Sequence, residues 1–422
     1  MSIKIDRSRF FIAALSIVLY FLLSYSLVNI IQPNYYEFVK FDEGEPEFEI
    51  LLISYFIPFF LTFILFVLPN SQFIYTIQFF ILVVIVYPAS ILLTYLNTDI
   101  RIIILNTVYF FAIYVVGNFF SLKFRTPILK ESQKVFLLFL ISIILIIPFV
   151  VIFGPHLNLQ NLLLNYIYES REVETELSNT YTGYLYTPLS NIIIPLLLLL
   201  AILHRQYGKA VFAFGMLMFM FLVGGHKLVF FGAFAITLFY FGTYYQKILI
   251  FLVGSIGLVL ISIVTFYVAH DFVMTSIVPR RIFFLPALLE VAYFDFFDGE
   301  PIFWSDSVLR GIFKYPFEIS TRNLIGKHAL SNVDTNANNG IISDGFMNFG
   351  VIGSLINILF VGLIYGIFNT LNISQRFFGL IFLLFFTFYS SYFFTSMLTH
   401  GGILLIVVAY IFLKDSKTSY GN

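Results

Sequence analysis

Apolar residues occur in long uninterrupted runs along this 422-residue chain, and short polar stretches separate the runs. Several runs reach about 18 residues or more without a charged side chain, which is the length of a membrane span and more than a soluble core requires. Taking about 20 apolar residues for each crossing, we predict an all-α polytopic membrane protein with about twelve transmembrane helices. The expected spans are residues 10–31, 50–68, 73–96, 102–120, 135–153, 188–203, 210–225, 228–245, 248–268, 349–370, 377–397 and 399–413.

The composition agrees with a membrane protein and narrows the available chemistry. Hydrophobic residues make up 60% of the chain and charged residues 11%, against about 25% charged residues in soluble domains. The chain contains no Cys, which excludes disulfides and thiolate chemistry. Lys and Arg together number 23, as do Asp and Glu, so overall charge gives no reason to expect a nucleic-acid partner. The lipid bilayer is the partner that the composition predicts.

The first apolar run follows a basic start, as the apolar region of a signal peptide does. It extends from Phe10 to Ile31, which is too long for a signal peptide, and no small-residue cleavage site follows it. We therefore expect a retained first span.

The distribution of basic residues predicts the orientation of the spans. With a cytoplasmic N-terminus, the inside segments contain thirteen Lys and Arg residues and the short outside loops contain four. Because Lys and Arg in short loops favour the cytoplasmic side, both termini are predicted to be cytoplasmic. The inside residues are Lys4, Arg7, Arg9, Lys123, Arg125, Lys130, Lys134, Arg205, Lys209, Lys247, Arg376, Lys414 and Lys417, and the outside residues are Lys40, Arg101, Arg171 and Lys227.

One predicted outer segment is much longer than the others. It runs from about residue 269 to residue 349, and loops of that length are uncommon and usually functional. We see no internal repeat and no low-complexity linker in the sequence. The chain is therefore interpreted as a single membrane domain, residues 1–422, with a large extracytoplasmic loop at 269–349.

The large loop concentrates basic side chains on a face where they are otherwise scarce. Its six basic residues are Arg280, Arg281, Arg310, Lys314, Arg322 and Lys327. One interpretation is an anionic partner. The other is that long loops escape the charge rule and that the nine acidic residues of the loop pair with the bases.

The segment from Arg281 to Phe297 is largely apolar, with a proline and two acidic residues in it. An additional span here would reverse the orientation of everything after it, so an interfacial helix on the outer leaflet fits better. Such a helix would hold Arg280 and Arg281 at headgroup level, where an Arg side chain can bind phosphate or pyrophosphate oxygens.

Turn-forming residues crowd at the end of the loop, from Asn336 to Gly353. The amides of Asn336 and Asn338 can contact sugar hydroxyls. The alternative, which composition slightly favours, is a tight turn that starts the next span.

A short turn between two spans adds a further candidate. Residues 210–245 must cross twice, yet 36 residues at about 1.5 Å each give roughly 54 Å, less than two hydrocarbon cores of about 30 Å. The turn from Gly224 to Lys227 must therefore lie at the outer membrane boundary, where Lys227 is a candidate for substrate binding.

These features resemble the bacterial oligosaccharide repeat-unit polymerases of the Wzy type (O-antigen and capsule polymerases), which are related to O-antigen ligases. The resemblance is carried by the twelve-span layout, the single large loop, RRIFFLPALLEVAYFDFF at 280–297 and NANNGIISDGFMNFGVIG at 336–353. It implies a GT-C-like bundle in the bacterial cytoplasmic membrane. The implied enzyme is a metal-independent inverting glycosyltransferase without a cofactor, which polymerises polyprenyl-pyrophosphate-linked repeat units into surface polysaccharide on the outer face. A lipid-linked donor and acceptor are the implied substrates. The protein partners that the resemblance suggests are a chain-length regulator and a flippase.

The reaction needs a base near the acceptor hydroxyl and positive charge at the departing pyrophosphate. Arg280, Arg281 and Arg322 match the second role, and the candidates for the base are Asp344 and His328. The expected substrate-binding residues are Lys227, Arg322, Lys327, Asn336 and Asn338. Asp295, Asp298 and Glu300 look like a solvated acidic turn rather than a metal site.

Two other functions remain open. A lipid-linked oligosaccharide flippase or other polysaccharide transporter also commonly has about twelve spans, although transporters tend to show two similar halves and charges near the bilayer midplane. A scaffold in an envelope-assembly complex is the third option, and it leaves the basic cluster of the large loop unexplained.

Overall fold

The computed structural model describes residues 7–41, 46–68, 71–122, 129, 131–163 and 167–413, and within these ranges the regular structure is helical, without a strand. The prediction for the two chain termini lies outside these ranges. So do six of the basic residues assigned to the inside, Lys4, Lys123, Arg125, Lys130, Lys414 and Lys417.

Within the described ranges, nine helices are long enough and apolar enough to cross a membrane. They are Ser8–Asn34, Phe48–Val67, Gln72–Leu96, Ile100–Phe119, Gln133–His156, Thr180–Leu203, Tyr207–Gly224, Tyr244–Ala269 and Ile341–Leu371. Each overlaps a predicted span, so the all-α polytopic prediction is confirmed at this level.

The other three predicted spans fall on shorter apolar helices, Val229–Tyr240, Gln375–Ser390 and Gly402–Leu413. Helix α13 (Lys227–Tyr240) has 14 residues, which at about 1.5 Å each reach roughly 21 Å, less than a hydrocarbon core of about 30 Å. The count of twelve crossings stays a prediction.

The chain forms two compact units. Unit 1 comprises residues 1–121, 243–369 and 388–393, and unit 2 comprises 122–242, 370–387 and 394–422. The helices of unit 1 are α1 (Arg7–Ser26), α2 (Gln32–Asn34), α3 (Tyr36–Val39), α4 (Phe48–Val67), α5 (Gln72–Phe80), α6 (Tyr87–Leu96), α7 (Ile100–Phe119), α14 (Tyr244–Ala269), α15 (Val273–Thr275), α16 (Leu285–Phe297), α17 (Thr321–Leu330) and nearly all of α18 (Ile341–Leu371). Unit 2 contains α8 (Glu131–Phe153), α9 (Ile167–Leu177), α10 (Thr180–Pro188), α11 (Ile194–Leu203), α12 (Tyr207–Gly224), α13, most of α19 (Phe378–Ser390) and α20 (Gly402–Val408).

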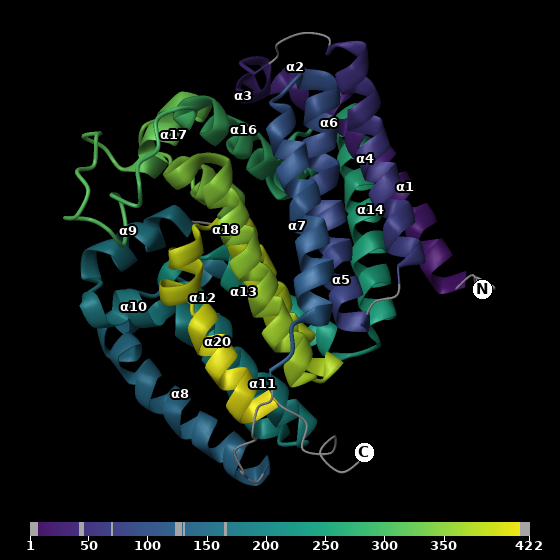
Figure 1. The fold of residues 1–422 in the computed structure, drawn as a ribbon. Helices are drawn as coiled ribbons and strands as arrows, with labels where there is room; N and C mark the ends of the chain where they lie inside the picture. The colour runs from purple at the N-terminus through teal and green to yellow at the C-terminus, as the bar shows by residue number, and fades with distance from the viewer. Residues whose placement is uncertain are drawn as a thin grey trace. The chain divides into compact units, whose positions relative to one another are not determined.

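The core of unit 1 is the continuous helix Gln72–Leu96, in which α5 and α6 are joined by a π-helical segment. Its apolar window is 94% buried, against 28% for Phe48–Val67 and 22% for Tyr244–Ala269, so the last two have the exposure of lipid-facing helices. Figure 1 shows α1, α4, α6 and α14 running side by side. Because lipid tails are as apolar as Leu, hydrogen bonds and packing hold such helices together. The Tyr87 hydroxyl, for example, is 2.8 Å from Thr62 Oγ1 and 3.2 Å from Ser16 Oγ.

In unit 2, the predicted turn between two spans is present. Helix α12 ends at Gly224, Gly225 adopts a left-handed conformation with φ of 58°, and α13 begins at Lys227. The guanidinium of Arg171, on α9, donates to the Gly225 carbonyl at 3.3 Å. The turn is therefore fixed by a neighbouring helix.

The predicted large loop is mostly helical. It contains α15, a π-helical stretch Ser276–Phe284, α16, α17 and the first residues of α18. The helix expected between Arg281 and Phe297 is present, but residues 287–294 are all buried against other parts of the protein. An interfacial helix would expose its apolar face to lipid, whereas α6 and α17 pack against α16 and cover it. Its position relative to the membrane interface stays a prediction.

Candidate functional site

A polar cavity of about 400 Å³ lies in unit 1 where α16 and α17 meet the end of α6 and the start of α7. Charged side chains of both signs line it. The titratable residues of the lining are Lys40, Asp99, Arg101, Asp295, Asp298 and His328. The rest of the lining consists of Phe41, Leu96, Asn97, Thr98, Val291 and Phe294. A cavity of this size is in the range of small-molecule sites, and we call it the His328 cavity.

The cavity wall contains a histidine paired with an aspartate. His328 Nε2 lies 2.8 Å from Asp295 Oδ2. The His328 side chain is 28% exposed, and the rings of Phe41 and Phe296 contact the imidazole edge-on. If the proton is on Nε2 and is donated to Asp295, then Nδ1 keeps its lone pair, which is the arrangement of an oriented general base.

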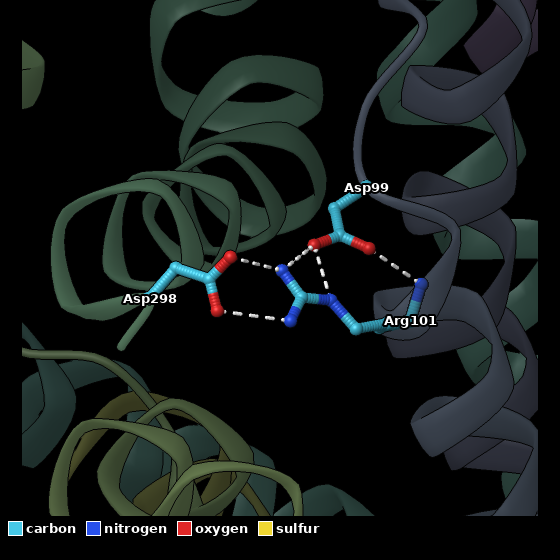
Figure 2. Close-up of polar contacts among 3 residues, drawn as sticks. All are labelled: Asp99, Arg101 and Asp298. Carbon is cyan, nitrogen blue, oxygen red and sulfur yellow. Dashed lines mark hydrogen bonds and ion pairs between the residues drawn. The ribbon is translucent and has the colours of Figure 1, made fainter. Parts of the chain in front are cut away.

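Arg101 forms a second charged group on the same wall (Figure 2). Its guanidinium donates to both carboxylate oxygens of Asp298, at 3.0 and 2.9 Å, and to Asp99 Oδ2 at 2.7 Å. Asp99 is also the N-cap of α7, where its other oxygen accepts from the Arg101 backbone N–H at 2.8 Å. Hydrogen bonds from Arg101 hold the pKa of the exposed Asp298 carboxyl below its usual value. In the acidic turn predicted at this place, Asp298 is thus paired with Arg101 and Asp295 is bonded to His328, whereas Glu300 is exposed.

Lys40 follows the short helix whose Glu37 pairs with Arg280, one of the two arginines predicted to bind pyrophosphate. Its ammonium donates to the backbone carbonyl of His328. One helical turn earlier, on α3, Glu37 forms an ion pair with Arg280, which donates from Nε at 2.7 Å. The guanidinium of Arg280 also lies 4.6 Å from the ring centre of Tyr35. Arg280 is therefore neutralised by a carboxylate and mostly covered.

The other predicted basic residues are more accessible. Arg281, Arg322 and Lys327 are all exposed. Arg322 and Lys327 lie on α17, the helix that carries His328. Among the residues that the structure describes, the side chain of Arg281 forms no hydrogen bond or ion pair. An anion can reach Arg281 without displacing a carboxylate.

Asp344 lies in a different environment. It is 3% exposed and accepts three hydrogen bonds, from Phe393 N at 2.9 Å, Asn348 Nδ2 at 3.0 Å and Asn357 Nδ2 at 3.3 Å. These bonds connect the start of α18 to its second half and to the segment at Phe393. The geometry favours a structural role for Asp344, and it does not line the His328 cavity.

The remaining predicted binding residues are not brought together with His328. Asn336 is exposed and Asn338 is partly buried, on the segment before α18, and neither lines the cavity. Lys227 starts α13 in unit 2, and its side chain lies outside the described residues.

A second buried carboxyl group belongs to Glu290 on α16. The side chain is 6% exposed, and Asn106 Nδ2 donates to its Oε2 at 3.4 Å. Glu290 Oε1 and Asn106 Oδ1 have no hydrogen-bond partner among the described residues. Both residues line a cavity of about 20 Å³, room for about one water molecule. Burial raises the pKa of Glu290 to about 8.

No family model, curated protein or solved structure matches this chain. Within the described ranges, no group of three or more His, Asp and Glu side chains is arranged to hold a metal ion.

Of the six titratable residues on the cavity wall, the sequence pointed to His328 alone as a functional candidate. Asp295 and Asp298 were interpreted as a solvated turn, and Lys40, Asp99 and Arg101 were not candidates. Arg101 and Asp298 are 197 positions apart, and Lys40 and His328 are 288 apart. One signal was available, because Lys40 and Arg101 are two of the four basic residues in the short outside loops, where Lys and Arg are disfavoured.

Proposed function

We propose that the protein polymerises polyprenyl-pyrophosphate-linked oligosaccharide repeat units on the outer face of a bacterial cytoplasmic membrane by inverting glycosyl transfer. The observation that carries the proposal is the His328–Asp295 pair on the wall of a polar cavity that also contains Arg101 and Lys40. A cavity of about 400 Å³ accommodates one or two sugar rings, and the carboxylates and amides on its wall are suitable partners for hydroxyls.

The chemistry assigns one task to each kind of residue. His328 accepts the proton of the acceptor hydroxyl while Asp295 stabilises the imidazolium that forms. The hydroxyl oxygen forms a bond to the anomeric carbon of the donor, and the bond from that carbon to the pyrophosphate oxygen breaks. The pyrophosphate leaves with the electron pair, and an exposed guanidinium stabilises its charge. Arg281 and Arg322 are more accessible for this task than Arg280, whose charge Glu37 already neutralises.

His328→Ala tests the proposal in cells that depend on this chain for surface polymer. We expect long polymer to disappear while lipid-linked single repeat units accumulate on the outer face. Arg281→Ala should give the same products with an unchanged protein level, whereas Arg280→Ala should lower the protein level because it leaves Glu37 unpaired. His270→Asn is the matched control, since His270 is an exposed left-handed cap that Asn tolerates.

Two outcomes would contradict the proposal. Normal polymer from the His328→Ala variant would show that His328 is not the catalytic base. Repeat units retained on the cytoplasmic face would indicate the flippase or transporter alternative instead.

A further inference from the structure

The segment between α16 and α17 exposes an unusual number of apolar side chains. In Figure 1 it is the long green stretch without helices beside α17. Ile312 is 74% exposed, Val308 45%, Phe313 44% and Phe303 39%. These four side chains occur within twelve residues, 303–314, and water is a poor environment for such a cluster.

The base of this segment is fixed to the break in α18. The backbone N–H groups of Ile302 and Phe303 donate to the carbonyls of Met347 and Asn348, at 3.0 and 3.2 Å. Trp304 N donates to Asn348 Oδ1 at 2.6 Å, and the Trp304 ring meets Phe349 edge-on with centroids 4.7 Å apart. The segment is therefore attached to α18 at residues 347–349.

This attachment point lies at the end of the apolar, lipid-facing surface of α18. Immediately after the break, α18 exposes Ile352 at 68%, Leu355 at 40%, Leu359 at 50% and Phe360 at 48%. Residues 350–371 are 22 residues, and at about 1.5 Å each they extend roughly 33 Å, close to a hydrocarbon core of about 30 Å. The exposed segment is attached where this surface ends.

The charges of the segment complete the pattern. Arg310 and Lys314 are exposed, and among the described residues their side chains form no ion pair. Within residues 303–314 the acidic residue is Asp306, and it is occupied, because Oδ2 accepts from the Thr321 N–H at 3.2 Å and from its hydroxyl at 2.7 Å. The segment thus presents apolar and cationic side chains, the combination that favours the interface of an anionic bilayer.

We propose that residues 303–314 form an interfacial anchor, which inserts Phe303, Val308, Ile312 and Phe313 into the outer leaflet and places Arg310 and Lys314 at the phosphates of anionic lipids. A bilayer is the occupant because the segment is continuous with the lipid-facing side of α18. Since Asp306 is bonded to the first residue of α17, the anchor sets the depth of the helix that carries His328.

Because the chain contains no Cys, single spin-labelled cysteines can measure the depth of the segment in proteoliposomes of phosphatidylcholine and phosphatidylglycerol. Ile312→Cys and Phe313→Cys are expected to be reached by oxygen and shielded from a water-soluble nickel chelate. Ile352→Cys is the lipid-facing control, and Glu318→Cys, exposed on the same connection, is the aqueous control. Adding Arg310→Ala and Lys314→Ala should make the label at 312 shallower in the anionic vesicles and leave it unchanged in phosphatidylcholine alone.

Two results would overturn the proposal. Accessibility of the 312 label to nickel equal to that at 318 would mean that the segment is in water. Shielding from both reagents would mean that protein, rather than lipid, covers it.

The unmodified chain gives a second measurement, because Trp304 is its single Trp. Lipids brominated near the headgroup end of the acyl chain should quench Trp304 fluorescence more strongly than lipids brominated near the terminal methyl.

Discussion

Two buried carboxyl groups in unit 1 have different surroundings. Three N–H donors satisfy Asp344, whereas Glu290 receives one long hydrogen bond from Asn106 and has one oxygen without a partner. An unsatisfied buried acceptor destabilises a fold, and an ionised one does so more strongly. Glu290 should therefore hold a proton over much of the physiological range.

This difference predicts how stability depends on pH. The pKa of Glu290 is raised from 4.5 to about 8 in the fold, so the folded state binds its proton more tightly than the unfolded state. The contribution of Glu290 to stability is greatest below about pH 4.5 and is lost as the pH rises to about 8. Glu290→Gln should remove this loss. In thermal unfolding of the detergent-solubilised protein, its midpoint should fall less than that of the unmodified protein between about pH 5 and pH 8.

Glu300→Gln is the control for this experiment, because Glu300 is exposed. It should follow the unmodified protein at every pH. Parallel curves for Glu290→Gln and the unmodified protein would show that Glu290 titrates normally.

At the residue scale, the sequence predicted the kinds of side chain in the site better than their partners. His328 was a candidate, but its pairing with Asp295 depends on how α16 and α17 pack, which no local pattern encodes. The pair of Arg101 and Asp298 could not be predicted for the same reason, since the two residues are 197 positions apart. Asp344 was a candidate for the base, and its burial with three hydrogen bonds, one of them from the distant Phe393 amide, has no local signal in the sequence.

At the scale of elements, α18 is two helices that fold closely together. Its regular geometry is interrupted at Phe349 and at Gly350, where φ is 62° and ψ is −150°, a conformation open essentially to Gly. The two parts then meet at Gly345 and Gly353, where a Cβ on Gly353 would overlap the Gly345 carbonyl oxygen. The tight turn predicted from the composition is this break.

Gly353→Ala should therefore destabilise unit 1, by about 1–3 kcal/mol or more, because the overlap is with backbone that cannot move aside. The measurement is the thermal unfolding midpoint, with the yield of folded protein. Gly257→Ala, on the exposed helix α14, is the matched control, since a Cβ there meets no atom within 4 Å. Equal midpoints for the two variants would show that the contact between the two parts of α18 is unimportant.

The spans themselves were predictable because a membrane helix satisfies its own backbone hydrogen bonds and needs only local apolar sequence. The start of α18 was not, since Ser343, Asp344 and Asn348 interrupt the apolar pattern there. The polar groups of Asp344 and Asn348 are satisfied by one another and by Phe393, which allows the helix to begin before the apolar run.

At the scale of the whole molecule, the number of crossings decides which face holds each loop. If α13 crosses, Thr243 is on the cytoplasmic side and residue 300 is outside. Single cysteines at Thr243 and Glu300 can test this with a membrane-impermeant maleimide, because the chain has no other Cys. We expect labelling at 300 in intact cells and at 243 only after the membrane is opened. Labelling of 243 in intact cells would show that the short helix α13 does not cross.

The hydrogen bond from the Phe393 amide to Asp344 has a consequence for biosynthesis. The two residues are 49 positions apart, so the ribosome must synthesise α19 before the donor exists. Until then, the carboxyl group lacks one of its three partners, and the first turns of α18 cannot dock in their final form. Phe294 of the cavity wall stacks on Phe346 of this part of α18, so the wall should reach its final form late in synthesis. A nascent chain that ends soon after Leu371 should expose this region to proteases, even when the earlier spans are already in the membrane.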